Sequence, residues 1–565
     1  MIYVEEKQPI KLPGWSSIFI TFTYNPKVVS VLKQLPLRYY ENYVWEVPIT
    51  DLKYIIENLS KIDTIQLKLM TTTHDKEIEI PQDYEFKTKP YNFQLDAIRY
   101  GINHKKWLLL DEMGLGKALT AIYIAEILYY LGKIDKCLVI CGLNSLKWNW
   151  ESEINKHSVL PCKILGKYTT STGKVKVLSV EERTNDLLKN DDAFFLITNI
   201  ETLRGEKVKK NDKIVIENRF VKAVKKLKIG MLIVDEVQYA KDPTSLQGEG
   251  LLKLDFIENI VVTSGTIIEN SPLDSFVPMK LTGHIKSTLT TYKVYYCEKG
   301  EYNKIIGYRH LNYLREHIGK VSLRRKKEDV LELPPKTYQI EYVEMNSKQE
   351  EFYNEIESGV YNQLDLVGNN PVLEFSIKAR LRQATAWTGM LSSTIKESAK
   401  LDRLYELIND ITEQGDKVLV FSTYKATLQQ AESQLKQFNT VLCDGDVGDA
   451  EIEQRKIKFQ TDPECKIMLA TWQKMGTGHT LTAANYVIFI DTPYNDSKFT
   501  QAGDRAYRIG TTKNVTIITL VTKNTYDERV LEIVQNKEML SDFLIDDIAD
   551  EENVNFMNMI SNKLV

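Results

Sequence analysis

Residues 111–117, Asp-Glu-Met-Gly-Leu-Gly-Lys, have the composition of a loop that binds the phosphates of a nucleotide. They follow the apolar residues 107–110, which predict a strand, and precede the apolar residues 121–125 of an expected helix. Glycines let the backbone curl around an anion, the helix N-terminus adds positive potential, and Lys117 supplies a point charge for the outer phosphates. One position departs from the usual pattern, because Ala118 stands where a hydroxyl side chain would bind magnesium.

An acidic pair follows another apolar segment. Asp235 and Glu236 come directly after residues 231–234, an expected buried strand. In a nucleotide-binding fold, Asp235 would bind Mg²⁺, and Glu236 would orient and deprotonate the attacking water. An acidic turn after a strand is common, as is a glycine turn at the start of a helix. The two together in one expected sheet favour ATP hydrolysis.

A basic pair occurs within residues 501–510, where Arg505 and Arg508 are three positions apart. On a helix, both guanidinium groups would lie on one face. Such arginines can stabilise the charge that develops on a γ-phosphate during its transfer. A solvated helix face gives the same spacing and is the alternative.

Two series of apolar segments must position these residues, one in residues 89–285 and the other in residues 401–537. Continuous apolar strands that alternate with helices are typical of parallel sheets covered on both faces. We therefore expect an α/β fold with two such lobes and a ligand cleft between them. The expected strands are 107–110, 138–140, 194–197, 231–234 and 260–262 in the first lobe, and 418–421, 467–470, 487–490 and 515–520 in the second.

Three further segments complete the predicted organisation. Residues 1–88 form a small α+β accessory module, because strand-like alternation at 18–24 gives way to helix-like patterns. Residues 286–400 are polar and rich in tyrosine, and we expect a mostly helical link with protrusions there. Residues 538–565 are expected to be a solvated acidic tail.

The bulk composition describes a globular protein. With 565 residues, 43% of them hydrophobic and 27% charged, the chain is expected to form about three domains. No apolar run reaches the roughly 18–20 residues of a membrane span, and the N-terminus lacks a signal-peptide pattern. We expect a cytoplasmic location, or a nuclear one in a eukaryote. The six cysteines are scattered, so neither a zinc site nor a disulfide framework is expected.

The net charge of −4 argues weakly against a nucleic-acid partner, but the distribution of charge matters more than its sum. Residues 203–228 contain ten Lys and Arg against three acidic residues, which would suit contacts with phosphates. A solvated surface is the alternative for this basic stretch. The abundance of Lys, Ile, Asn and Tyr indicates a small AT-rich genome, viral or bacterial, with a phage as one source.

The order of these motifs resembles that of the SNF2 family of superfamily 2, the ATP-driven translocases of double-stranded DNA. The resemblance runs from about Tyr91 to Lys537 and implies two RecA-like lobes with helical insertions. The matching segments are 91–94 (Q motif), 111–117, 143–150 (motif Ia), 198–203 (motif Ib), 235–238 (motif II), 263–266 (motif III), 323–336 (the link between lobes), 421–423 (motif IV), 471–484 (motif V), 491–495 and 501–510 (motifs Va and VI), and 525–529.

The resemblance also implies roles for individual residues, with ATP and Mg²⁺ as ligands. The nucleotide would be bound by Gln94, which would contact adenine, and by Met113, Gly114, Leu115, Gly116, Lys117, Ala118, Leu119 and Gly478. Catalysis would use Lys117, Asp235, Glu236, Arg505 and Arg508, with Asp235 as the metal ligand. Hydrolysis would be coupled to lobe movement by Gln238, Ser264, Gly265 and Thr266, and DNA phosphates would be contacted by Lys147, Thr198, Asn199 and Thr471.

Four residues depart from the family pattern. Ala118 replaces a threonine and Tyr507 a histidine, while Thr480 and Thr511 replace an asparagine and a glutamine. One magnesium ligand is therefore missing, and hydrolysis could be weaker than in relatives.

The N-terminal module resembles the HARP-type domain of annealing helicases. The similar residues are Phe19, Tyr24, Asn25, Pro26, Leu35, Pro36, Arg38, Tyr40 and the segment 45–48. This resemblance implies recognition of branched DNA, with Trp45 among the contacts. An unrelated α+β accessory domain is the alternative.

These features predict an ATP-dependent translocase that remodels branched DNA by fork regression, branch migration of Holliday junctions or strand annealing, in replication, recombination or repair. We expect double-stranded and branched DNA as the partner, no membrane contact and a monomer. The alternatives are a non-catalytic binder of DNA junctions whose ATP site has decayed, a remodeller of protein–DNA complexes, and a strand-separating helicase.

Overall fold

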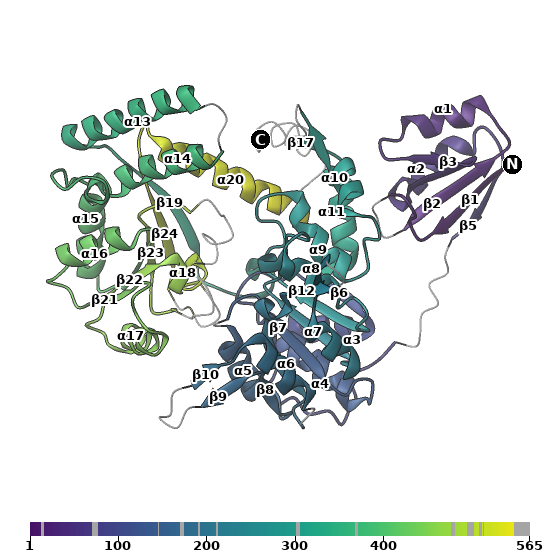
Figure 1. Cartoon of the computed structure of the whole chain (residues 1–565), viewed down its shortest axis with the longest axis horizontal. Coiled ribbons are helices and arrows are strands. Elements are labelled where there is room, and N and C mark those ends of the chain that lie inside the picture. The colour runs from purple at the N-terminus through teal and green to yellow at the C-terminus, as the bar shows by residue number, and fades with distance from the viewer. Residues whose placement is uncertain are drawn as a thin grey trace. The chain divides into compact units, whose positions relative to one another are not determined.

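A computed structural model describes residues 1–12, 16–69, 77–144, 146–169, 175–189, 192–210, 213–300, 305–367, 371–475, 481–493, 502–507, 511 and 513–546 (Figure 1). The chain forms two compact units. The first unit comprises Met1–Lys326 together with Met539–Val565, and the second comprises Lys327–Glu538.

The N-terminal part of the first unit is a small α+β domain. Its sheet has the order β3-β4-β2-β1-β5, antiparallel except for the parallel pair β1 and β5. The elements are β1 (Ile2–Lys7), β2 (Ser17–Phe22), α1 (Pro26–Gln34), β3 (Tyr39–Glu41), β4 (Val44–Pro48), α2 (Leu52–Leu59) and β5 (Ile65–Lys68). Both helices pack on one face of the sheet, because Leu32 of α1 and Ile55 of α2 share a core with Ile18 of β2. The strand expected within 18–24 corresponds to β2, and helices α1 and α2 follow it as the sequence pattern predicts.

Helix α1 illustrates why these elements form. Asn25 precedes it in an extended conformation and accepts a hydrogen bond from the backbone N–H of Lys27, and Pro26 occupies the first helical position. An Asn cap followed by Pro is a strong helix start. This small domain also contacts α11, where the hydroxyl of Tyr313 donates to Oδ1 of Asp51 at 3.0 Å.

The larger part of the first unit contains a seven-stranded parallel sheet, the lobe 1 sheet, with the order β18-β6-β15-β14-β7-β11-β8. Its strands are β6 (Lys106–Leu109), β7 (Cys137–Cys141), β8 (Cys162–Ile164), β11 (Phe195–Asn199), β14 (Met231–Asp235), β15 (Asn259–Thr263) and β18 (Ser322–Leu323). Its helices are α3 (Asn92–Asn103), α4 (Lys117–Tyr130), α5 (Leu146–His157), α6 (Val180–Leu188), α7 (Arg219–Lys226), α8 (Leu246–Leu252), α9 (Phe276–Leu281), α10 (Leu289–Tyr296) and α11 (Leu311–Val321).

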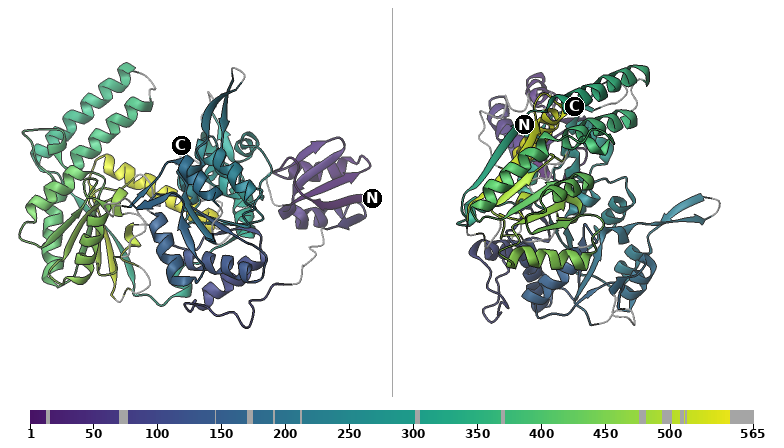
Figure 2. Two further views of the ribbon diagram at one scale, coloured as in Figure 1. Left: turned by 60° about the horizontal axis from the view of Figure 1, so that its bottom comes forward. Right: turned by 90° about the vertical axis from the view of Figure 1, so that its left-hand side faces the viewer.

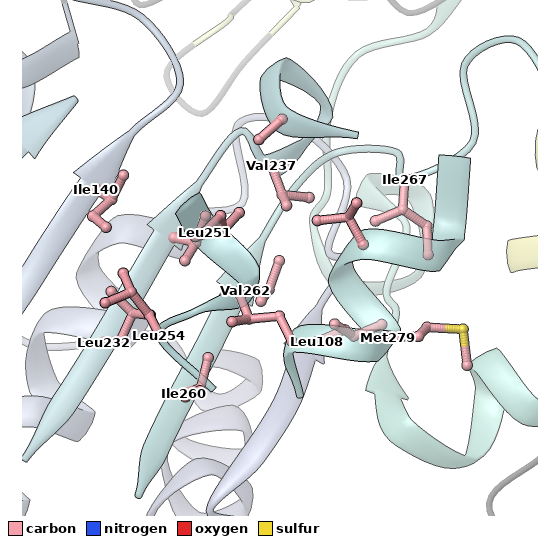
Figure 3. Close-up of a cluster of buried hydrophobic side chains, with 14 of the residues drawn as sticks. Leu108, Ile140, Leu232, Val237, Leu251, Leu254, Ile260, Val262, Ile267 and Met279 are labelled. Carbon is pink, nitrogen blue, oxygen red and sulfur yellow. The ribbon is translucent and has the colours of Figure 1, made fainter. Parts of the chain in front are cut away.

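Both faces of the lobe 1 sheet are buried. Leu108 faces a core shared with Leu254 and Met279, and Figure 3 shows these side chains in one cluster with Leu232 and Val262. Its neighbour Leu109 faces the opposite core, which includes Ile122 of α4. Successive residues of a strand point to opposite faces, so a sheet buried on both sides requires continuous apolar strands. This is the pattern that the sequence shows.

Among the described residues, the first unit also has three separate two-stranded sheets and several short turns. These sheets are β9 (Lys167–Thr169) with β10 (Val175–Val177), β12 (Glu206–Lys210) with β13 (Lys213–Glu217), and β16 (Cys297–Lys299) with β17 (Ile305–Tyr308). The 3-10 turns of the unit are η1 (Ile49–Asp51), η2 (Ile200–Leu203), η3 (Val237–Ala240) and η4 (Pro272–Ser275).

The second unit is built on a six-stranded parallel sheet, the lobe 2 sheet, with the order β19-β24-β23-β20-β22-β21. Its strands are β19 (Lys336–Val343), β20 (Val418–Ser422), β21 (Thr440–Cys443), β22 (Ile467–Thr471), β23 (Tyr486–Phe489) and β24 (Val515–Thr522). Its helices are α12 (Lys327–Val330), α13 (Ser347–Val367), α14 (Pro371–Ala386), η6 (Thr388–Met390), α15 (Ala399–Glu413), α16 (Lys425–Gln434), α17 (Asp449–Thr461) and α18 (Trp472–Met475), and α20 (Tyr526–Ile545) begins in this unit.

The segment 286–400 contains more than the expected helices. Helices α13 and α14 lie side by side (Figure 2), but the segment also supplies β18 to the lobe 1 sheet and β19 to the lobe 2 sheet. Strand β19 alternates Tyr338, Ile340 and Tyr342 with polar residues, a pattern that suits an edge strand with one exposed face. The predicted α/β class with two parallel-sheet lobes is confirmed.

Candidate ATP site and its surroundings

The loop after β6 curls back before helix α4 begins at Lys117. Gly114 and Gly116 have φ angles of 88° and 79°, in the left-handed region that favours glycine. A Cβ atom at Gly116 would collide with Nε2 of Gln94. The sequence can therefore form this turn only with glycine there, and the turn leads into the N-terminus of the 14-residue helix α4.

Lys117 points back along this loop. Its Nζ donates to the backbone oxygens of Asp111 at 2.8 Å and Glu112 at 3.3 Å. Burial lowers the pKa of Lys117, while the nearby carboxylates, Glu236 first among them, act in the opposite direction. A phosphate placed beside the ammonium group would favour its charged form.

Gln94 is tied to the same loop. Its Nε2 donates to the backbone oxygen of Leu115 at 2.9 Å, and its Oε1 accepts from the backbone N–H of Tyr91 at 2.9 Å. The side chain thus joins the start of α3 to the phosphate loop. Contact between Gln94 and adenine stays a prediction.

The residues after Lys117 are directed into the protein. Ala118 is half-buried against the core under α4, Leu119 is buried, and the hydroxyl-bearing Thr120 is fully buried. Met113 lies on the other side of the loop, where its Cγ would be 2.6 Å from a Cβ atom at Gly265. The loop and the segment 264–266 are therefore in close contact.

Asp235 is held at the carboxyl end of β14 by two neighbours. Thr263 Oγ1 donates to its Oδ1 at 2.7 Å, and Trp150 Nε1 donates to its Oδ2 at 2.8 Å. Each carboxylate oxygen retains a further lone pair for a cation. Mg²⁺ in nucleotide sites takes one or two carboxylates together with phosphates and waters, so a single fixed Asp235 suits that role.

Glu236 connects the acidic pair to the segment 264–266. Its φ of 54° is left-handed, which is uncommon for a residue with a side chain and occurs at functional sites. Gln238 Nε2 donates to Oε2 of Glu236, and Ser264 Oγ donates to Oε1 of Gln238 at 3.0 Å. A change at the carboxylate of Glu236 can therefore be transmitted through two hydrogen bonds to Ser264.

The segment 264–266 continues this set of contacts. The backbone N–H of Thr266 donates to Ser264 Oγ at 3.1 Å, and Thr266 Oγ1 lies 2.9 Å from Ser541 Oγ of helix α20. The four residues predicted to couple hydrolysis to movement thus lie along one path from the acidic pair to α20.

Two arginines of the basic run 324–327 support the loop, a role that the sequence analysis missed. Arg325 forms a forked ion pair with Asp111, with Nε 2.9 Å from Oδ1, and its guanidinium lies over the ring of Phe93. Arg324 donates to the backbone oxygens of Leu110 at 2.8 Å and Gly265 at 3.1 Å. The signal in the sequence was the run of four basic residues, 324–327, whose partner Asp111 lies 214 positions from Arg325.

Three of the residues predicted to contact DNA lie together at the carboxyl ends of β7 and β11. Lys147, Thr198 and Asn199 are all buried. Arg183, which the sequence analysis did not identify, donates to Asn199 Oδ1 at 2.9 Å and to Thr202 Oγ1 at 2.8 Å. Burial, and then the charge of Arg183, lower the pKa of Lys147 to about 8.

The second unit holds a buried ion cluster around Asp504. Lys327 Nζ lies 2.9 Å and Lys336 Nζ 3.0 Å from Oδ1 of Asp504. Both ammonium groups also lie over the ring of Tyr507, at 5.2 and 5.3 Å from its centroid. Burial raises the pKa of Asp504, but the two lysines outweigh it and hold the pKa below its ordinary value.

This cluster positions the predicted arginine motif. Arg505 follows Asp504 directly and is buried, and its backbone oxygen accepts from the N–H of Leu481 at 2.9 Å. Thr471 is buried at the end of β22. Arg508 and Gly478 lie outside the described residues.

Trp45 of the N-terminal domain is only 6% exposed and belongs to the domain core. Its contact with DNA stays a prediction. Within the described residues, no group of three or more His, Cys, Asp and Glu side chains is arranged to hold a metal ion, and no helix has the length and apolar character of a membrane span.

A parallel-sheet lobe that carries a phosphate loop and an acidic pair, followed by a second parallel-sheet lobe, is an arrangement suited to binding a nucleotide. The chain belongs to the SNF2-related family. The SNF2-related domain matches residues 50–414, and the helicase conserved C-terminal domain matches residues 399–510.

Several proteins are similar to this chain over most of its length. An uncharacterized ATP-dependent helicase of Mycoplasma pneumoniae is 25% identical over 92% of this chain and 48% of its own length. The DNA annealing helicase and endonuclease ZRANB3 of Bos taurus is 26% identical, over 86% of this chain and 43% of its own length. A SWI/SNF-related, matrix-associated, actin-dependent regulator of chromatin of Xenopus tropicalis, subfamily A containing DEAD/H box 1, is 26% identical over 82% of this chain and 51% of its own length.

The chain thus spans about half the length of the curated relatives that it matches. Among solved structures, the SWI2/SNF2 ATPase core of Sulfolobus solfataricus in complex with dsDNA is similar to this chain. The superposition includes 84% of this chain and 100% of the Sulfolobus chain, with 20% sequence identity and a TM-score of 0.36.

Proposed function

We propose that this protein hydrolyses ATP to move along double-stranded DNA. The observation that carries the proposal is a connected set of contacts: Gln238 joins Glu236 to Ser264, and the adjacent Gly265 packs against Met113 of the phosphate loop. A motor needs its hydrolytic group to be mechanically connected to the rest of the fold, and these hydrogen bonds make that connection. Membership of the SNF2-related family supports the same activity.

The residues present fit ATP with Mg²⁺. The loop glycines, the N-terminus of α4 and Lys117 would bind the phosphates, and Asp235 would hold the metal, which supplies charge neutralisation when bound. Glu236 would accept a proton from the attacking water. Arg505 and Arg508 would stabilise the charge on the γ-phosphate.

Duplex DNA would be contacted through its backbone by the cluster that contains Lys147, Thr198 and Asn199, by Thr471, and by the basic stretch 203–228. Backbone contacts of this kind are sequence-tolerant and weaken with salt. We propose branched DNA as the particular substrate. The reaction on it would be fork regression, branch migration or strand annealing, and it would take place in the cytoplasm, or in the nucleus of a eukaryote. The relative named as an annealing helicase supports this choice.

ATPase rates without DNA and with single strands, linear duplex or a four-way junction test the proposal. We expect the duplex to stimulate hydrolysis and the junction to stimulate it most. Equal rates in all four conditions would refute a DNA-driven motor. Stimulation by duplex and junction to the same extent would refute the branched-DNA substrate alone.

A second candidate is an attenuated enzyme that mainly binds DNA junctions, because Ala118 replaces the hydroxyl residue expected from the family resemblance and packs against the apolar core. Ala118→Thr separates the two cases. Hydrolysis by the variant but not by the natural chain would establish the attenuated form. Equal, measurable rates in both would show that hydrolysis does not need the hydroxyl, and no hydrolysis in either would favour a junction binder without catalysis.

A further inference from the structure

The hairpin of β3 and β4 in the N-terminal domain ends in an unusual turn. Glu41 pairs with Val44, so Asn42 and Tyr43 are the two residues of the turn. Their φ angles are 50° and 65°. A two-residue hairpin turn with both φ angles positive is the type I′ turn, for which Asn at the first position is common and Gly at the second is strongly preferred.

Tyr43 occupies the position that favours glycine. A bulky side chain in the left-handed region is a backbone outlier and destabilises the turn. Packing does not compensate for this cost, because Tyr43 is 84% exposed. A large aromatic side chain held in a strained conformation and directed into solvent indicates selection for contact with something outside the domain.

A second aromatic side chain lies on the same hairpin. Tyr40 pairs across the strands with Trp45, and their ring centroids are 4.8 Å apart. Trp45 is buried in the core, whereas Tyr40 is 51% exposed. The ring of Tyr40 therefore packs against the buried indole of Trp45, which restricts its position. The hairpin thus presents two exposed tyrosines, Tyr40 and Tyr43.

Two cations contact aromatic rings elsewhere in this domain, Lys7 at the end of β1 and Lys11 in the segment that follows it. Lys11 Nζ is 5.4 Å from the ring centroid of Tyr39, and Lys7 Nζ is 5.8 Å from that of Phe19. These rings lie on the opposite face of the sheet from Tyr40, and the two lysines also pair with Glu41 and Glu5. A binding site on this hairpin would therefore depend on its exposed rings, because unpaired bases of single-stranded nucleic acid stack on aromatic side chains.

We propose that Tyr43, with Tyr40, stacks on unpaired bases of single-stranded DNA. The site would engage the strands exposed where a duplex branches, and this inference rests on the proposed action on branched DNA. It also assigns the stacking role to the exposed tyrosines and a supporting role to Trp45.

Tyr43→Gly provides a test in which stability and binding change in opposite directions. Glycine suits the turn, so the full-length variant should be at least as stable to heat as the natural chain. Its affinity for a fork with unpaired arms should fall by about tenfold, since loss of one stacked base contact has an effect of this size. Its affinity for blunt duplex and its duplex-stimulated ATPase rate should not change. Fluorescence anisotropy with labelled fork and duplex gives both affinities.

Two further variants sharpen this experiment. Tyr43→Phe should bind the fork as the natural chain does, because stacking does not need the hydroxyl. Tyr3→Ser is the matched control, since Tyr3 is an exposed tyrosine on β1 of the same sheet, and it should bind normally.

Unchanged fork affinity in Tyr43→Gly would overturn the inference. An equal loss for fork and blunt duplex would also overturn it, because stacking on unpaired bases cannot affect a blunt duplex. An ATPase of the natural chain that does not respond to duplex would refute the proposed motor, whereas the fork-binding result would still decide the role of Tyr43.

Discussion

Nε of Arg325 lies 2.9 Å from Oδ1 of Asp111, the first residue of the phosphate loop. The carboxylate is almost completely buried, and the guanidinium also donates to the backbone oxygen of Phe93. A buried carboxylate is tolerated when it is paired and hydrogen-bonded. Residues 324 and 325 thus anchor the loop, and Lys327, two positions further on, pairs with Asp504 in the second unit.

Arg325→Met should weaken ATP binding by about tenfold, or 1.4 kcal/mol, because the loop loses the group that fixes its first residue. Arg325→Lys should recover only part of this loss, since an ammonium group cannot form the forked pair. A titration with a fluorescent ATP analogue measures the affinity.

A double-mutant cycle shows whether the pair with Asp111 is responsible for the effect on ATP binding. Asp111→Asn should have a similar effect, and the double variant should be little worse than either single variant. Additive losses would show that Arg325 acts on ATP binding independently of Asp111.

Glu236→Gln should retain binding of ATP and DNA and reduce turnover by about 10²–10⁴-fold, the usual contribution of a general base. The amide still has an oxygen that can accept from Gln238, so the hydrogen bond towards Ser264 can be kept. Steady-state ATPase rates, together with equilibrium ATP binding, test this expectation. Turnover at the natural rate would exclude Glu236 as the base.

Asp504→Asn should destabilise the second unit by about 3–5 kcal/mol, because it leaves the buried Lys327 and Lys336 facing each other without a counter-ion. Asp416→Asn is the matched control. Asp416 forms an exposed pair with Lys513 at 2.8 Å, and its loss should change the unfolding free energy by less than about 1 kcal/mol. Urea unfolding monitored by circular dichroism compares the two variants.

Lys147→Met should make the protein more stable at pH 7 and weaken its binding to duplex DNA. The folded pKa of about 8 lies below the ordinary value of 10.5, so the folded state binds fewer protons between these two values. The stability of the natural chain therefore rises from pH 8 to pH 10.5, and below pH 8 the buried charge is unfavourable. The stability advantage of the variant should shrink as the pH rises through this window. A constant advantage from pH 7 to pH 10 would contradict a depressed pKa at Lys147.

The sequence by itself determined the two parallel-sheet lobes and the chemical groups of the ATP site. Apolar strands such as 231–234 are continuous because both faces of the sheet are buried, and the loop needs glycine at 114 and 116 because of its left-handed turns. These constraints act between residues close together in the chain, so they leave a local pattern.

Only the tertiary structure decided which partners these groups have. The pairing of Arg325 with Asp111 spans 214 positions, and Thr266 meets Ser541 across 275. The resemblance to HARP-type domains marked Trp45 as a contact residue, yet it lies in the core, whereas the strained Tyr43 is exposed. Burial and long-range pairing arise when the sheets and helices pack together, and no local spacing of residues specifies them.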